Sequence, residues 1–129
     1  MKSQTVTHLM APIFPHLIPG QYDFIFYIAK EANGYFMQGN SRKLSKEWLK
    51  NREESGHVVK LKKPFKIKEG QMIVFTRNNV PRPNMKESSA GFIRSLELFL
   101  LSREDNYDFS KKKKLGKWKD LVAVKASVK

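Results

Sequence analysis

The stretch QYDFIFYIAK, residues 21–30, has the strongest strand pattern in the chain. It is rich in Tyr, Phe and Ile, which favour strands, and its apolar run is almost continuous. Such a run is typical of a central strand that is covered on both faces. Residues 31–34, EANG, favour a tight turn, and residues 35–38 form a second short strand. The sequence therefore predicts a β-hairpin.

A basic helix is predicted after the hairpin. Ser41 or Ser45 can cap its N-terminus, and Gly56 is suited to end it just after Ser55. Trp48 belongs to its short apolar stripe, and positively charged side chains occupy much of the remaining surface.

Residues 71–77, QMIVFTR, are expected to form a further strand, and residues 78–86 a loop that contains two prolines. Residues 90–103 are expected to form a second helix, because their Phe, Ile and Leu side chains fall within one face at helical spacing. The predicted fold class is α+β, a small β-β-α-β-α domain in which two helices pack on one sheet.

The length of 129 residues fits a single domain. We expect residues 1–18 to be a proline-broken lead-in, residues 19–109 the α+β domain, and residues 110–129 a Lys-rich tail. Trp118, Leu121, Val122 and Val124 indicate that part of this tail docks on the domain.

The composition excludes several classes of protein. Without cysteine the chain has no disulfide scaffold, thiolate zinc site or cysteine nucleophile. The phosphate-binding glycine motifs and the Gly-x-Ser-x-Gly hydrolase motif are also missing. No apolar stretch has the length of a membrane span and residues 1–20 lack the pattern of a signal peptide, so we expect a cytoplasmic protein with no membrane partner.

The charge is large and uneven. Lys and Arg outnumber Asp and Glu by 25 to 12, which gives +13, and most of the excess lies in residues 40–68 and 110–129. Two separate basic blocks with aromatic residues between them favour a nucleic-acid partner, DNA or RNA, over a merely solubilising surface. An acidic protein partner is the alternative. The side chains expected to contact nucleic acid are Arg42, Lys43, Lys46, Lys50, Arg52, Lys60, Lys62, Lys63, Lys111, Lys112, Lys113 and Lys114.

Two kinds of titratable residue are candidates for chemistry. Glu97 lies in an apolar segment, where a carboxylate costs free energy unless it is paired or binds a metal. A salt bridge to Arg94 is the simpler explanation. His57 directly follows the basic helix and could carry a proton, whereas His8 and His16 are expected to be surface or partly packed side chains.

The order of elements resembles the GIY-YIG nuclease superfamily. PGQY at residues 19–22 enters the first strand, and YFMQG at residues 35–39 ends the second. A basic helix, a strand, and an apolar helix with Glu97 in a Leu-Glu context follow. The resemblance spans about residues 19–110.

This resemblance implies phosphodiester hydrolysis with Mg²⁺ or Mn²⁺ on Glu97. It implies that Tyr22 or Tyr35 orients the nucleophile and that Arg42 or Arg52 holds the scissile phosphate. Three positions depart from the family pattern, namely Gln21, Met37 and Glu47. A non-catalytic DNA- or RNA-binding accessory protein or ribonucleoprotein component, which needs no cofactor, is therefore the alternative.

Overall fold

The computed structural model describes residues 3–12, 22–38, 43–76 and 96–123, and it shows a mostly-β protein. Its strands form two antiparallel sheets, one of five strands and one of four. Within these residues α1 (Lys46–Ser55) is the only helix of seven residues or more. The predicted α+β fold, with two helices packed on one sheet, is therefore wrong.

The strand order is β5-β4-β3-β1-β6 in the five-stranded sheet and β2-β7-β8-β9 in the four-stranded sheet. The strands are β1 Ser3–Met10, β2 Tyr22–Phe24, β3 Tyr27–Glu31, β4 Gly34–Met37, β5 Lys43–Leu44, β6 Val58–Lys68, β7 Gln71–Thr76, β8 Glu97–Ser102 and β9 Lys113–Lys117. The described residues also contain the 3-10 helices η1 Arg103–Asp105 and η2 Phe109–Lys111 and the short helix α3 Trp118–Leu121.

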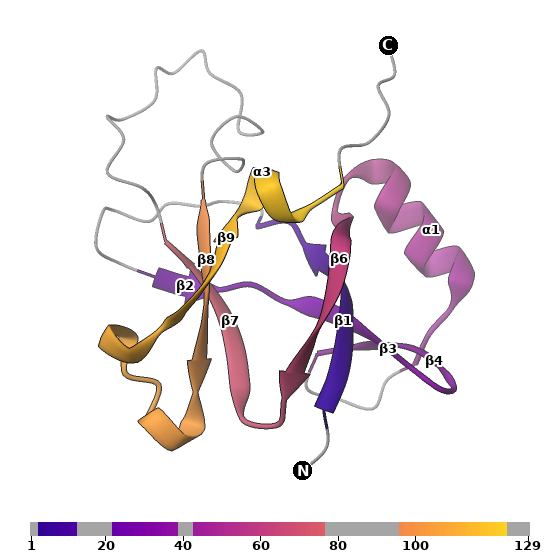
Figure 1. Cartoon of the computed structure of the whole chain (residues 1–129). Coiled ribbons are helices and arrows are strands. Elements are labelled where there is room, and N and C mark those ends of the chain that lie inside the picture. The colour runs from indigo at the N-terminus through magenta and orange to yellow at the C-terminus, as the bar shows by residue number, and fades with distance from the viewer. Residues whose placement is uncertain (1–2, 13–21, 39–42, 77–95, 124–129) are drawn as a thin grey trace, which may run out of the picture.

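Strands β2 and β3 are two parts of one extended run that crosses from the four-stranded to the five-stranded sheet (Figure 1). The Ile25 N–H donates to the carbonyl of Ile73 in β7. The next residue, Phe26, accepts a hydrogen bond from the N–H of Met10 in β1. The strand predicted for residues 21–30 is confirmed as the two strands β2 and β3, and the hairpin that it forms with β4 is confirmed as well. Its predicted central position, covered on both faces, is wrong for β2, which is an exposed edge strand.

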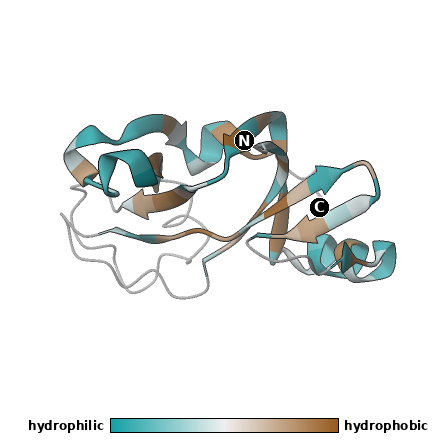
Figure 2. Ribbon diagram, turned by 90° about the horizontal axis from the view of Figure 1, so that it is seen from below, coloured by the Kyte–Doolittle hydropathy of each residue, from teal (hydrophilic) through white to brown (hydrophobic). Residues whose placement is uncertain are grey.

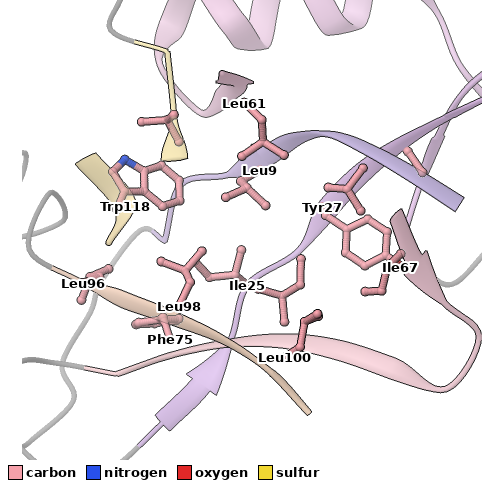
Figure 3. Packing of buried hydrophobic residues seen from close by; sticks show 14 residues of the cluster. Leu9, Ile25, Tyr27, Leu61, Ile67, Phe75, Leu96, Leu98, Leu100 and Trp118 are labelled. Atoms are coloured by element: carbon pink, nitrogen blue, oxygen red, sulfur yellow. The ribbon is translucent and has the colours of Figure 1, made fainter. Parts of the chain in front are cut away.

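The hairpin of β6 and β7 makes a second crossing between the sheets, through a turn in which Gly70 has φ +90°. The two sheets pack face to face and enclose one main core, to which strands of both sheets contribute (Figure 3). Its buried members are Val6, Leu9, Ile25, Tyr27, Ala29, Leu61, Ile67, Ile73, Phe75, Leu96, Leu98, Leu100, Trp118 and Val122.

The C-terminal part of the described chain belongs to this core. Trp118 is only 4% exposed, and its N–H donates to the carbonyl of Leu96 at 2.8 Å. Val122 forms a bridge to Leu61 of β6. The predicted docking is confirmed for Trp118, Leu121 and Val122, whereas Val124 lies outside the described residues. Lys111 belongs to η2, and Lys113 and Lys114 belong to the edge strand β9 instead of a free tail.

Helix α1 covers the outer face of the five-stranded sheet. Leu49 of α1 is buried with Ile28, Leu44 and Val58 from the strands. Ser45 caps the helix by accepting the Trp48 N–H at 3.0 Å, and Gly56 ends it at φ +84°, as predicted. The rest of the helix is mostly hydrophilic (Figure 2). None of the described helices is long and apolar enough to span a membrane.

The helix predicted for residues 90–103 is a strand over the part that the structure describes. Leu98 and Leu100 of β8 enter the main core, whereas Phe99 and Leu101 join a second cluster on the outer face of the four-stranded sheet. A strand that is apolar on both faces produces a continuous apolar run. Such a run also places several apolar residues on one face of a helical wheel, so periodicity alone does not separate the two structures.

Candidate nucleic-acid interface

The residues predicted for catalysis lie on different parts of the molecule. Tyr22 is on β2 of the four-stranded sheet, whereas Tyr35 is on β4 and packs against the cluster beneath α1. Arg52 and His57 are exposed near the C-terminal end of α1. Arg42 lies outside the described residues. The two tyrosines therefore do not share one pocket.

The side chains of these residues have other partners. The ring of Tyr35 meets His8 edge-on, at 5.8 Å between ring centroids. The Arg52 guanidinium lies 5.2 Å from the centre of the Trp48 ring, in a cation–π contact. The His57 Nδ1 is 2.6 Å from Ser55 Oγ. These contacts hold three of the candidate side chains close to the surface of α1.

Glu97 is the first residue of β8, so its predicted place inside a helix is wrong. Its carboxylate lies 3.6 Å from the Lys114 ammonium, in a salt bridge between neighbouring strands. Arg94, the partner expected from sequence, lies outside the described residues. Within the described ranges no group of three or more His, Cys, Asp or Glu side chains gathers around a possible metal position. Glu97 thus has a cation as its nearest charged neighbour.

Part of each basic block lies in an edge strand. Strand β6 is one edge of the five-stranded sheet, and β9 is one edge of the four-stranded sheet. The predicted lysines of both strands are exposed, as are the predicted cationic side chains of β5 and α1. In the described part of the chain Lys114 is the only one of the β6 and β9 lysines with an ion pair. The exposed lysines of the two strands are Lys60, Lys62, Lys63, Lys66, Lys68, Lys113 and Lys114.

Residues 118–123 bring these two edges to the same side of the molecule. Helix α3 directly follows β9, and the Ala123 N–H then donates to the carbonyl of Lys60 in β6. The chain therefore passes from one basic edge to the other, with α3 between β9 and β6 (Figure 1). Lys119 of α3 is exposed between them. The two basic edges, which are far apart in sequence, are thus joined by residues 118–123, and we call the side of the molecule where they meet the basic side.

Exposed aromatic residues lie on the outer face of the four-stranded sheet, on β2, which is the edge strand opposite the basic edge strand β9. Tyr22 and Phe24 occupy alternate positions of β2, on either side of the exposed Asp23, and are 40% and 50% exposed. Phe24 lies opposite Val74, Val74 opposite Phe99, and Phe99 opposite Lys114. Because residues opposite each other in an antiparallel sheet share a face, one row runs from an exposed Phe to an exposed Lys.

Aromatic rings and a lysine are already in contact on this face. Tyr22 stacks on Phe109, with the ring centroids 4.8 Å apart and the planes 5° from parallel. The Lys112 ammonium lies 4.4 Å from the centroid of Phe109 and 5.4 Å from that of Phe99. The face therefore offers π-surfaces and a cation side by side, which is the pair of groups that a base and its phosphate require.

Sequence reasoning identified the lysines but missed the aromatic residues Phe24, Phe26 and Phe109. The sequence does contain a signal for two of them. In residues 24–27 Ile25 and Tyr27 face the core, whereas Phe24 and Phe26 face outward. Both sets are apolar, so the run resembled a strand covered on both sides.

His8, expected to be a surface or partly packed side chain, is buried beneath α1 at 3% exposure. Burial lowers its pKa, an effect partly opposed by Glu53, whose carboxylate is 3.5 Å from Nε2. Lys60 contributes a smaller lowering of the same pKa. Thr7 Oγ1 lies 2.8 Å from the other ring nitrogen. His8 is thus a buried link between β1 and α1, on the face opposite the aromatic residues.

The candidate interface is described from the positions of its side chains and does not depend on a family resemblance. The resemblance to the GIY-YIG superfamily depended on an element order that ends in a Glu-bearing helix, and Glu97 begins a strand here. The nuclease assignment stays a prediction. Comparison of the chain with models of protein families, with curated proteins and with solved structures finds no match.

Proposed function

We propose that this protein binds nucleic acid and does not cut it. The observation that carries the proposal is the joining of the two basic blocks on one side, through residues 118–123 between β9 and β6. A polyanion that lies along this side can meet lysines of both blocks at once. Each lysine placed on a phosphate releases condensed counterions, which favours binding.

The ionic environment supports this proposal. Of the seven exposed lysines of β6 and β9, six have no ion pair within the described residues and are available to a phosphate. Lysines on edge strands also discourage pairing of the edges of two molecules. If the lysines only prevent such pairing, they keep the protein soluble and do not bind a polyanion. If they bind nucleic acid, the affinity should depend steeply on the salt concentration.

Support for binding without hydrolysis comes from the positions of the candidate catalytic groups. Arg52 lies on α1, which covers the five-stranded sheet, whereas Glu97 lies on β8 of the four-stranded sheet and is paired with Lys114. Hydrolysis of a phosphodiester needs the nucleophile, the metal ligand and the phosphate-binding cation within reach of one another.

The test is fluorescence anisotropy with labelled DNA and RNA oligonucleotides between about 50 and 200 mM salt. We expect affinity to fall steeply, with a log–log slope of roughly 0.7 to 0.9 for each phosphate contact. The triple variant Lys60→Gln, Lys62→Gln, Lys63→Gln should bind more weakly and with a smaller slope. Lys30→Gln on β3 is the control outside the basic side and should leave both quantities unchanged.

Two results would contradict the proposal. Absence of binding at low salt, or binding that salt does not weaken, would favour an acidic protein partner instead. Cleavage of a plasmid or RNA in Mg²⁺ or Mn²⁺ that stops in chelator would restore the endonuclease hypothesis.

A further inference from the structure

Three aromatic side chains on one strand point to a more specific ligand. Tyr22, Phe24 and Phe26 are 40%, 50% and 55% exposed, and they are the exposed large hydrophobic residues of the described chain. They occupy alternate positions, so they project from the same side of the continuous β2–β3 run. Single exposed apolar residues are common, whereas three neighbouring aromatic rings on one side mark a binding surface.

A packed apolar cluster lies beneath the rings of Tyr22 and Phe24. Val74 and Leu101 are at most 1% exposed and form the base of the outer cluster with Phe99. Phe109 packs edge-on against Phe99, with centroids 5.7 Å apart, and Tyr22 stacks on Phe109. The rings therefore stand on a packed sheet face, which limits the conformational entropy that they lose when a ligand binds.

Two of the exposed rings have no stacking partner among the described residues. Neither Phe24 nor Phe26 makes a ring contact with an aromatic or cationic side chain of the described residues. A flat apolar ring that is exposed and unstacked can accept a nucleobase on its π-face, whichever base it is.

Charge identifies the ligand that fits this surface. The Lys112 ammonium lies over two rings of the face, and Lys114 ends the row that begins at Phe24. Glu97 is the carboxylate in the adjacent row, and Lys114 is paired with it. An uncharged apolar partner would use the rings but not the lysines. A strand of nucleic acid uses both, through its bases and its phosphates.

We infer that the outer face of the four-stranded sheet, together with Phe26 where the β2–β3 run joins the five-stranded sheet, is a stacking platform for unpaired bases, so that the preferred ligand is single-stranded DNA or RNA. This inference rests on the proposed nucleic-acid binding. In a duplex the base faces are buried in the stack, and rings that rise from a flat sheet cannot reach them. In a single strand the bases can turn toward Phe24 and Phe26 while the phosphates approach Lys112 and Lys114.

The test compares affinities of the full chain for a single strand and for a duplex of the same length, each as DNA and as RNA. We expect the single strand to bind at least ten-fold more tightly at equal salt. A difference between thymidine and uridine oligonucleotides would show whether the 2′-hydroxyl is read.

The variant that tests the platform is Phe24→Leu with Phe26→Leu, which keeps apolar side chains but removes the π-faces. We expect single-strand affinity to fall roughly 10- to 100-fold, the loss typical of stacked aromatic residues, with the salt slope unchanged. Phe36→Leu, the same replacement in β4 of the other sheet, is the matched control. Phe24→Trp at the same exposed position should bind a single strand more tightly, and its fluorescence should be quenched on binding.

The outcomes separate this inference from the proposed function. Equal binding of single strand and duplex, or full affinity in the double Leu variant, would overturn the platform and leave the basic side as the binding surface. Failure of every form of nucleic acid to bind, whether or not an acidic protein binds instead, would overturn both.

Discussion

The β2–β3 run contributes side chains to both outer faces of this molecule. Those side chains are exposed on one face and buried on the other. Along the β2–β3 run, Phe24 and Phe26 are half exposed, whereas Ile28, two residues further, is fully buried. The difference is helix α1, whose Leu49 covers Ile28 on the five-stranded sheet (Figure 1). Phe24 on the four-stranded sheet, and Phe26 where the run joins the five-stranded sheet, have no such cover among the described residues. An apolar outer face is therefore structural where α1 packs and available to a ligand where it does not.

The largest effect expected from this comparison is on stability. Leu49→Ala should lower the free energy of unfolding by about 2–5 kcal/mol, because it leaves a cavity beneath α1 while Ala keeps the helix propensity. Phe24→Ala on the open face should change it by only about 0.5 kcal/mol, as surface substitutions do. Urea denaturation of both variants measures the contrast. A Phe24 variant as unstable as the Leu49 variant would mean that the open face is a structural surface.

The contrast between the two faces also explains which parts of the fold could be predicted. The signals that depend on local chemistry were sufficient for the cap at Ser45, the end of α1 at Gly56 and the β3–β4 hairpin. Residues 96–101 were misinterpreted because burial on two faces and burial on one helical face produce similar runs of Leu and Phe. Which of these applies is decided by sheet partners that are distant in the chain, here β7 and β9.

The candidate site shows the same division. The clusters of Lys in β6 and β9 are visible in the composition, so the basic blocks were predicted. Their meeting on one side depends on residues 118–123, and the exposure of Phe24 depends on the absence of a covering element such as α1 among the described residues. Both features depend on the tertiary structure, so no local sequence pattern predicts them.

The second prediction compares the lysines beside the two faces. Lys112→Gln with Lys114→Gln, next to the open face, should weaken single-strand binding and reduce the salt slope by roughly 0.7 for each phosphate that is no longer neutralised. Lys46→Gln with Lys50→Gln, on the helix that covers the other face, removes the same charge and should change the slope less. Anisotropy titrations at several salt concentrations give both slopes. A larger decrease of the salt slope in the Lys46→Gln, Lys50→Gln variant would show that nucleic acid binds on the face covered by α1.

A smaller effect is expected from pH, and on the covered face only. The folded protein holds the pKa of His8 below its ordinary value, chiefly through burial, with Lys60 adding to the effect and Glu53 opposing it. The unfolded chain therefore binds more protons than the folded one as the pH falls through about 6.5. The neutral, buried His8 therefore leaves the folded protein at its full stability above about pH 6.5. The free energy of unfolding decreases as the pH falls from that value toward the lowered pKa of His8.

The measurement is the urea midpoint at several pH values for the wild type and for His8→Gln. The wild type should become less stable on acidification, and the variant should lack the part of that dependence that His8 causes. Stacking on Phe24 and Phe26 involves no titrating group, so affinity for a neutral-backbone analogue of the oligonucleotide should stay constant over the same range. An identical pH dependence in variant and wild type would exclude His8 as its source.

The smallest expected effect is that of Glu97, and it distinguishes two opposite roles. If Glu97 is the carboxylate that repels phosphates beside the open face, Glu97→Gln should strengthen single-strand binding a few-fold at low salt, because Lys114 is freed and one negative charge is removed. The missing salt bridge should cost less than about 1 kcal/mol of stability, since the Lys114 side chain is 63% exposed. The gain should fade at high salt, because it is electrostatic. If Glu97 instead holds a divalent cation, the same variant weakens binding in Mg²⁺ and abolishes any metal-dependent cleavage. Titrations with and without Mg²⁺ therefore give opposite signs for the two roles, and tighter binding in both conditions is the result that the open aromatic face predicts.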